Sequence, residues 1–321
     1  MLSEFITEHK LPATFASSAR KWFLPVAQQL EALVVARKGK IGPSDKSETT
    51  PVFLGINGCQ GSGKSTLAAL LNHYLSTKPQ LNVVNLSLDD FYLSQDARHR
   101  LAKEVHPLLA TRGVPGTHDV DLLHTVLKCL KNGQRIALPR FDKSQDNPFP
   151  KADWLLSPAQ VDVVIIEGWC WGVTAEEEGS LESPVNLLER IQDQDAIWRR
   201  YVNQQLQQHY QPLYAFMDKW LMLKAPSFDC VKHWRWQQEQ KLAEKVSALQ
   251  SETDISKAIS KAASKPSSSI ENKVMTHEQV MSFISYFQRL TEHGLTTLPP
   301  ECDLVFSLDE QRQITALQGA I

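Results

Sequence analysis

The stretch GINGCQGSGKST, residues 55–66, decides the fold. Four residues separate Gly58 from Gly63, and Lys64 and Ser65 follow Gly63 directly. A short apolar segment, PVFLGING (51–58), precedes the turn, and a helical one, KSTLAALLNHYLS (64–76), follows it. Glycines let consecutive backbone N–H groups curl around an anion, and the helix N-terminus adds a positive dipole. The stretch therefore predicts a phosphate-binding P-loop.

The P-loop pattern predicts a nucleoside triphosphate and assigns roles to its last residues. Lys64 is expected to reach the β- and γ-phosphates, and the Ser65 hydroxyl to ligate Mg²⁺. The alternative is a glycine-rich turn that holds no ligand. A GTPase would need an Asn-Lys-x-Asp stretch to recognise guanine, and the sequence contains none. The expected nucleotide is therefore ATP.

Apolar and amphipathic segments alternate beyond the P-loop. Strands are expected at 81–88, 134–141 and 161–169, and a helix at 120–133. The continuous apolar run VDVVIIEGW at 161–169 is typical of a strand buried on both faces of a parallel sheet. This alternation predicts an α/β fold: a P-loop NTPase with a doubly wound, mainly parallel sheet flanked by helices.

Helical patterns flank this core. Residues 19–37 read as a helix interrupted near Pro25, inside an N-terminal helical extension over 1–50. The second half is expected to form a helical lid and C-terminal region, with a last strand and turn. Its helices are predicted at 197–223, 228–250 and 276–294, and the strand at 302–317.

We predict a single domain over 1–321, with a helical lid-side region at 190–245. Residues 251–273 are rich in Ser, Lys and Ala and poor in large apolar residues. They are interpreted as a mobile insertion, and a short solvated helix over 254–264 is the alternative.

Composition narrows the class of protein. The net charge of −2 provides no basic field for nucleic acid or an anionic membrane. The five cysteines are far apart, with no C-x-x-C pair, which argues against disulfides and zinc. No apolar stretch approaches the length that spans a bilayer. We expect a cytoplasmic monomer that binds neither nucleic acid nor membrane.

Carboxylates end two of the expected strands. Glu167 follows the apolar strand at the position that faces the metal in P-loop proteins; the alternative is an exposed strand-end acid. Asp89 and Asp90 follow the 81–88 strand. Because consecutive strand residues point to opposite faces, we expect only Asp89 to act chemically and Asp90 to serve loop N–H groups. Tyr92 then either walls the acceptor pocket or anchors the loop.

Cationic side chains for an acceptor occur in two short segments. HPLLATRGVPGTHDV offers Arg112 and His118 from irregular backbone, and LPRFDKS offers Arg140 and Lys143. Each has ordinary loop salt bridging as its alternative. Arg235, in a later helix, is a candidate to contact the triphosphate. The alternative is that Lys232, Arg235 and Glu239 form a solvated helix face with i,i+4 pairing.

Several motifs together carry a family resemblance. GINGCQGSGKST, SLDDFYLS, HPLLATRGVPGTHDVDLL, LPRFDKS, VVIIEGWCWG, LKAPSFDCVKHWRWQQE and MTHEQVMSFISYFQRLT occur in order between about residues 50 and 310. Together they resemble the plant-type P-loop D-glycerate 3-kinase family and its yeast and bacterial kinase relatives. More distantly, the chain is similar to uridine kinase, phosphoribulokinase and bacterial pantothenate kinase.

The resemblance implies an ATP-dependent small-molecule kinase that phosphorylates a hydroxyl, with D-glycerate the first acceptor to try. It implies Lys64, Asp89 and Glu167 as catalytic groups, and Mg²⁺ near Ser65, Asp89 and Glu167. ATP is then expected at Gly58, Cys59, Gln60, Gly61, Ser62, Gly63, Lys64, Ser65 and Thr66.

The sequence departs from the family pattern after LPRFDKS, where QDNPFPKADW replaces a stretch bearing glycine and arginine. Two alternatives stay open. One is a kinase for another acceptor of the uridine kinase and pantothenate kinase group. The other is a non-kinase, ATP-binding switch protein that signals through its helical half.

Overall fold

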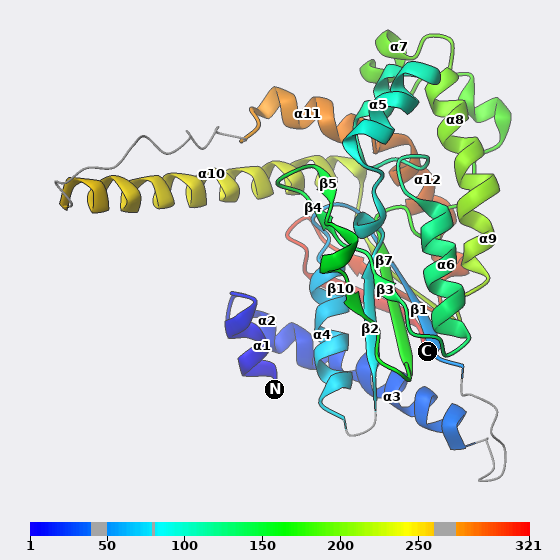
Figure 1. The fold of residues 1–321 in the computed structure, drawn as a ribbon, viewed down its shortest axis with the longest axis vertical. Coiled ribbons are helices and arrows are strands. Elements are labelled where there is room, and N and C mark those ends of the chain that lie inside the picture. Colours follow the sequence, from blue (N-terminus) through cyan, green and yellow to red (C-terminus); the bar gives the residue numbers. More distant parts are fainter. Residues whose placement is uncertain (40–49, 79–80, 260–273) are drawn as a thin grey trace.

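A computed structural model describes residues 1–39, 50–78, 81–259 and 274–321, with side chains placed outside 245–259. Its centre is a six-stranded sheet in the order β10–β9–β8–β1–β7–β2 (Figure 1). All neighbouring strands are parallel except β9 and β10, which form an antiparallel hairpin at one edge. The strands are β1 (Val52–Gly58), β2 (Val83–Ser87), β7 (Val163–Gly168), β8 (Lys219–Lys224), β9 (Leu304–Leu308) and β10 (Ile314–Gly319).

The order of the central strands brings the predicted functional residues together. Strand β7 lies between β1 and β2, and Glu167 near its end is in register with Ile56 of β1 and Ser87 of β2. Every residue of β1 and β7 is buried, as expected for strands covered on both faces. Because parallel strands end at the same edge, the P-loop, Glu167 and the residues after β2 meet there.

Helices cover both faces of the sheet. Figure 1 shows α4 on one side and α6, α8 and α9 grouped on the other. Helix α4 packs against β1, β2 and β7. The helices are α1 (Leu2–Glu8), α2 (Phe15–Ser18), α3 (Leu24–Gly39), α4 (Lys64–Ser76), α5 (Gln95–Glu104), α6 (Val120–Lys131), α7 (Leu187–Gln192), α8 (Ile197–Gln205), α9 (Gln211–Tyr214), α10 (Phe228–Ile259), α11 (His277–Ser285) and α12 (Gln288–Thr297).

The N-terminal helices are packed onto this core. Phe5 of α1 is fully buried, and its ring lies 5.5 Å from that of His73 in α4. A π-helical turn, Ala19–Phe23, joins α2 to α3. Pro25 lies just after this turn and lacks a backbone N–H, which agrees with the irregularity expected near Pro25.

One predicted helix is wrong at its end. The interval 197–223 forms α8, a π-helical turn and α9, but its last residues form strand β8 in the centre of the sheet. The lid-side region predicted at 190–245 therefore contains a core strand and is not wholly helical. The cause is the short apolar run Leu221–Leu223, whose length fits a buried strand as well as a helix.

The strand-like segment 134–141 also lies elsewhere than a doubly wound sheet would suggest. Its residues form β3 (Ala137–Leu138) and begin β4 (Phe141–Asp142). These pair with β6 (Leu155–Leu156) and β5 (Asn147–Pro148) in two separate small sheets. The segment thus builds an excursion beside the sheet edge, and this excursion carries Lys143 toward the site.

The structure describes only part of the mobile insertion predicted at 251–273. Residues 251–259 continue helix α10, and residues 260–273 lie outside the described residues. Figure 1 shows α10 running away from the body of the molecule. Among the described residues, no helix combines the length and apolar character that crossing a membrane requires.

Candidate active site

The P-loop joins the end of β1 to the start of α4. Gly61 and Gly63 have positive φ angles of 81° and 96°, which side chains rarely adopt. A Cβ atom on Gly61 would stand 2.8 Å from the Cβ of Trp234 in α10. Glycine is therefore needed both for the turn and for the close approach of α10, which covers the P-loop.

A polar cluster lies directly beneath the first turn of α4. Glu167 is 5% exposed, and its Oε1 accepts hydrogen bonds from the hydroxyls of Ser65 at 2.8 Å and Ser87 at 3.0 Å. Its Oε2 lies 3.7 Å from Lys64 Nζ and has no hydrogen-bond partner among the described residues. Burial opposes the charge of Lys64, but Glu167 and Asp89 outweigh it and raise the pKa of Lys64.

Asp89 lies between two cations. Its Oδ2 pairs with Lys143 Nζ at 2.6 Å, and its Oδ1 accepts a hydrogen bond from the Tyr92 hydroxyl at 2.8 Å. Burial alone would raise the pKa of this carboxyl. The charges of Lys143 and Lys64 and the two hydrogen bonds outweigh burial and lower the pKa to about 2. Asp89 is thus held ionised at neutral pH.

Asp90 has the supporting role predicted for it, although for a different reason. The two aspartates stand in a 3₁₀ turn, Leu88–Phe91, and not in the strand, so strand alternation does not separate them. The turn directs Asp90 toward the β4 segment, where its Oδ1 accepts the N–H of Phe141 at 3.2 Å. Burial raises the pKa of Asp90, whereas that of Asp89 is lowered.

Asp89 and the P-loop open into one cavity of ≈ 450 Å³. Its lining includes Lys64, Ser65 and Asp89, together with five other predicted site residues: Gln60, Tyr92, Arg112, Lys143 and Arg235. Aromatic rings of Trp169, Phe283 and Phe287 also line it. The sequence reasoning did not identify these three aromatic residues.

Arg112 and Arg235 enter the cavity from opposite elements and are each held by a carboxylate. Arg112 pairs with Asp146, which also binds the buried Arg98 at 2.7 Å. Arg235 pairs with Glu239 at 2.7 Å. The i,i+4 pairing of the alternative is therefore present, but Glu239 is 2% exposed, so this helix face is not solvated there. Each guanidinium group is therefore held at the cavity wall by a carboxylate.

His118 and Arg140 are not brought into this cavity. His118 lies behind Tyr92, with its ring stacked at 4.7 Å and its Nδ1 hydrogen bonded to the Tyr210 hydroxyl at 2.6 Å. Burial lowers the pKa of His118 to about 4, so it is a neutral group. Arg140 is exposed, with its guanidinium over Phe149 at 5.2 Å. Neither is positioned to touch an acceptor in this conformation.

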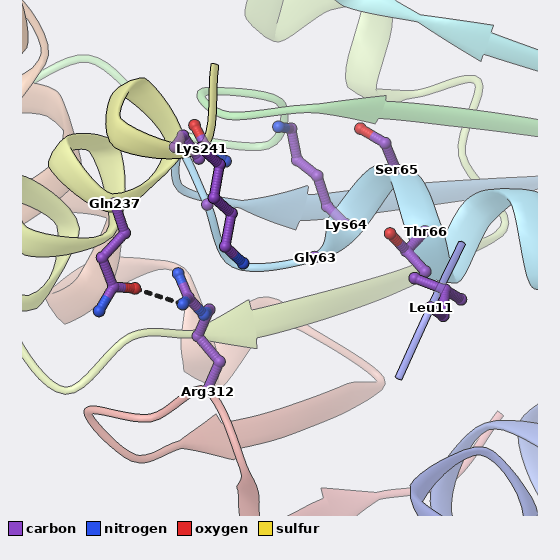
Figure 2. Close-up of a pocket in the computed structure, with 10 residues that line it drawn as sticks. Leu11, Gly63, Lys64, Ser65, Thr66, Gln237, Lys241 and Arg312 are labelled. Atoms are coloured by element: carbon purple, nitrogen blue, oxygen red, sulfur yellow. Dashed lines mark hydrogen bonds between the residues drawn. The ribbon is translucent and has the colours of Figure 1, made fainter. Parts of the chain in front are cut away.

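A second cavity of ≈ 380 Å³ lies on the other side of Lys64 and Ser65 (Figure 2). Gly61, Gly63 and Thr66 of the P-loop also line it, so the predicted nucleotide residues border two cavities that share Lys64 and Ser65. The remaining lining comes from Leu11, Gln237, Gln238, Lys241 and Arg312, none of which the sequence reasoning identified. They come from three segments that lie far apart in the sequence.

Comparison with known proteins decides the family. A family model described as "Phosphoribulokinase / Uridine kinase family" matches residues 53–224, more than half of the chain. The chain belongs to this family. The matched interval runs from β1 to β8 and contains the P-loop, Asp89 and Glu167. The family predicted by resemblance is confirmed, and the protein is a P-loop small-molecule kinase.

Individual relatives extend over most of this kinase. It is 33% identical over 288 residues to the "Uncharacterized kinase mug58" of Schizosaccharomyces pombe. The aligned region covers 83% of this chain and 91% of the relative. It is 23% identical over 316 residues to the chloroplastic D-glycerate 3-kinase of Arabidopsis thaliana, covering 95% of this chain and 62% of the relative.

A solved structure supports the same fold. The D-glycerate 3-kinase from Cryptococcus neoformans superimposes with a TM-score of 0.71 at 25% identity, over 92% of this chain and 98% of that one. The predicted α/β fold with a mainly parallel sheet is therefore confirmed for the described residues.

Proposed function

We propose that this kinase transfers the γ-phosphoryl group of ATP to a hydroxyl of D-glycerate. One observation carries the proposal: the ionised Asp89 faces the same cavity as Lys64 and Ser65 of the P-loop. A hydroxyl placed against Asp89 therefore lies on the side of the P-loop where a γ-phosphate would end. D-glycerate comes first because two similar proteins carry the name D-glycerate 3-kinase.

The residues under the P-loop fit a Mg²⁺ ion. The Ser65 hydroxyl and Glu167 provide adjacent hard oxygen donors, and Glu167 Oε2 is buried without a hydrogen-bond partner among the described residues. Mg²⁺ prefers oxygen ligands of this kind together with phosphates. When bound, the ion neutralises charge on the β- and γ-phosphates. Asp89 would support it only from a greater distance, since its oxygens already bind Lys143 and Tyr92.

The chain's own groups then divide the work of the transfer. In the proposed reaction the acceptor oxygen bonds to the γ-phosphorus as the bond from that phosphorus to the bridging oxygen of ADP breaks. Lys64 stabilises the charge on the transferring oxygens. Asp89 orients the hydroxyl and takes its proton. Its low pKa fits a late proton transfer, which a loose phosphoryl transition state allows.

Arg112 is the proposed contact for the acceptor's anionic group. Its guanidinium lines the cavity beside Asp89, and Asp146 holds one of its nitrogens. A planar guanidinium presents several donors, so a second edge is left to bind a carboxylate. Arg235 is proposed to contact the phosphates from α10. Both roles need a cation at the cavity wall, which each residue provides.

An acceptor screen tests the function directly. Purified protein with Mg-ATP is offered D-glycerate, L-glycerate, uridine, pantothenate and ribulose 5-phosphate, and ADP formation is followed. We expect D-glycerate to raise turnover at least tenfold over the basal rate, with a phosphoglycerate detected by ³¹P NMR. Turnover with only one of the other acceptors would show that D-glycerate is not the acceptor, while the kinase activity would still be supported. Basal hydrolysis unaffected by every acceptor would favour the ATP-binding switch.

Replacing Lys143 with Met should shift the pH dependence of the reaction. Lys143 is the largest of the influences that lower the pKa of Asp89, so its loss raises that pKa. Activity that needs ionised Asp89 is lost as pH falls through this pKa. We expect the acid limb of kcat/KM to lie at higher pH in Lys143→Met than in wild type, and Lys143→Arg to restore it. A loss of kcat/KM that is equal at every pH, with the acid limb unchanged, would contradict the role assigned to ionised Asp89.

A further inference from the structure

The second cavity has the chemistry of a site for an aromatic base. Figure 2 shows Leu11 beside Thr66 at one end, with Gln237 and Arg312 at the other. Lys241 extends from α10 toward the P-loop between them. The space is thus bounded by the N-terminal segment, α10 and the β9–β10 turn. A nucleotide whose phosphates occupy the P-loop can extend into it through the shared residues Lys64 and Ser65.

Arg312 is held in an unusual and well-supported position. Its backbone φ angle is 65°, a left-handed conformation that non-glycine residues adopt at a cost. Its guanidinium lies 5.6 Å above the ring of Trp234, which is fully buried. Its Nη2 donates a hydrogen bond to Gln237, whose amide is also hydrogen bonded with His233.

The same tryptophan fixes the turn that carries Arg312. Trp234 Nε1 donates a hydrogen bond to the carbonyl of Glu310 at 2.7 Å. Trp234 does not line the cavity, whereas Arg312 does. Arg312 therefore lies against the buried indole and also borders the open space of the cavity. An arginine plane of this kind stacks on π-faces.

We propose that Arg312, supported by Trp234 and Gln237, is the platform on which the aromatic base of the nucleotide stacks. Leu11 provides an apolar surface of the same pocket. This inference rests on the proposed use of a nucleoside triphosphate, and it adds the base-binding subsite and its specificity for an aromatic ring. Base stacking on a side chain contributes about 1–3 kcal/mol.

Binding experiments can separate the base from the phosphates. Calorimetry of the full chain with Mg²⁺ compares ATP with inorganic tripolyphosphate, which has the phosphates but no base. For Arg312→Ala we expect ATP binding to weaken by about 5- to 150-fold, the range of one stacked base. Tripolyphosphate binding should change less than twofold. Arg312→Lys keeps the charge but not the plane, and it should not restore ATP binding.

A control variant and folding measurements separate loss of base binding from unfolding. Arg190→Ala, an exposed arginine on α7, should bind both ligands as wild type does. Thermal unfolding and circular dichroism of each variant verify that the protein remains folded. Equal weakening of ATP and tripolyphosphate, or full rescue by Arg312→Lys, would place Arg312 on the phosphates and overturn the platform. Wild-type protein that binds neither ligand would overturn the proposed function itself.

Discussion

Substituting Ala for Lys64 is expected to abolish phosphoryl transfer while the protein stays folded. Lys64 lies 3.7 Å from Glu167 and lines both cavities, so we expect its charge to face the γ-phosphate of any nucleotide in the P-loop. Its ammonium stabilises charge that grows on the transferring oxygens. We expect kcat to fall by at least about 10³-fold, a loss of roughly 4 kcal/mol of transition-state stabilisation. Steady-state turnover with ATP and the acceptor measures this.

Two further variants show whether the loss of activity in Lys64→Ala is due to the charge of Lys64. Lys64→Met retains the aliphatic stem and should be as inactive as Lys64→Ala, which separates the charge from packing. Lys103→Ala removes an exposed lysine of α5 and should keep wild-type turnover. Both Lys64 variants leave the buried Glu167 without its nearest cation, so we expect a lower Tm with circular dichroism unchanged. Wild-type turnover in Lys64→Ala would show that the P-loop is not the phosphate site.

The sequence was sufficient where function depends on local chemistry. The P-loop lies within residues 55–66, between a strand and a helix that are both evident from their apolar patterns. Glu167 and Asp89 lie beside it because parallel strands end at one edge of a sheet. That rule needs only the strand type and not the strand order. The neighbouring positions of β1, β7 and β2 then bring Asp89 to the cavity that Lys64 and Ser65 line, and Glu167 against these two P-loop residues.

The sequence alone did not predict the features that depend on packing between distant segments. Strand β8 was predicted as helix because its apolar run is too short to show a period. The loop GVPGTHDV was predicted to offer His118 to an acceptor, yet His118 is buried. Thr117 and Tyr210 provide internal hydrogen-bond partners for the backbone of this loop. Arg312 lies far along the chain from the P-loop, and only the sheet brings its turn alongside α10. No local pattern contains that information.

Asparagine substitutions are expected to distinguish the chemical roles of the two neighbouring aspartates, Asp89 and Asp90. Asp89→Asn keeps the shape of the side chain and its capacity to accept the Tyr92 hydroxyl, but removes the negative charge that Lys143 and Lys64 surround. An amide does not take the acceptor's proton. We therefore expect kcat to fall by about 10²- to 10⁴-fold, the range of a lost general base. The Kd of Mg-ATP, measured by calorimetry, should change less than threefold.

Asp90→Asn is the matched control for this loss, because it makes the same chemical change one residue away. Asp90 accepts the N–H of Phe141, and an asparagine carbonyl can accept it equally well. Its turnover should stay within about threefold of wild type, whereas Asp90→Ala should lose roughly 1 kcal/mol of stability with that hydrogen bond. If Asp89→Asn weakened Mg-ATP binding as much as it lowered kcat, Asp89 would act on the metal and its phosphates. If the two Asn variants lost activity equally, the chemistry would not belong to Asp89 alone.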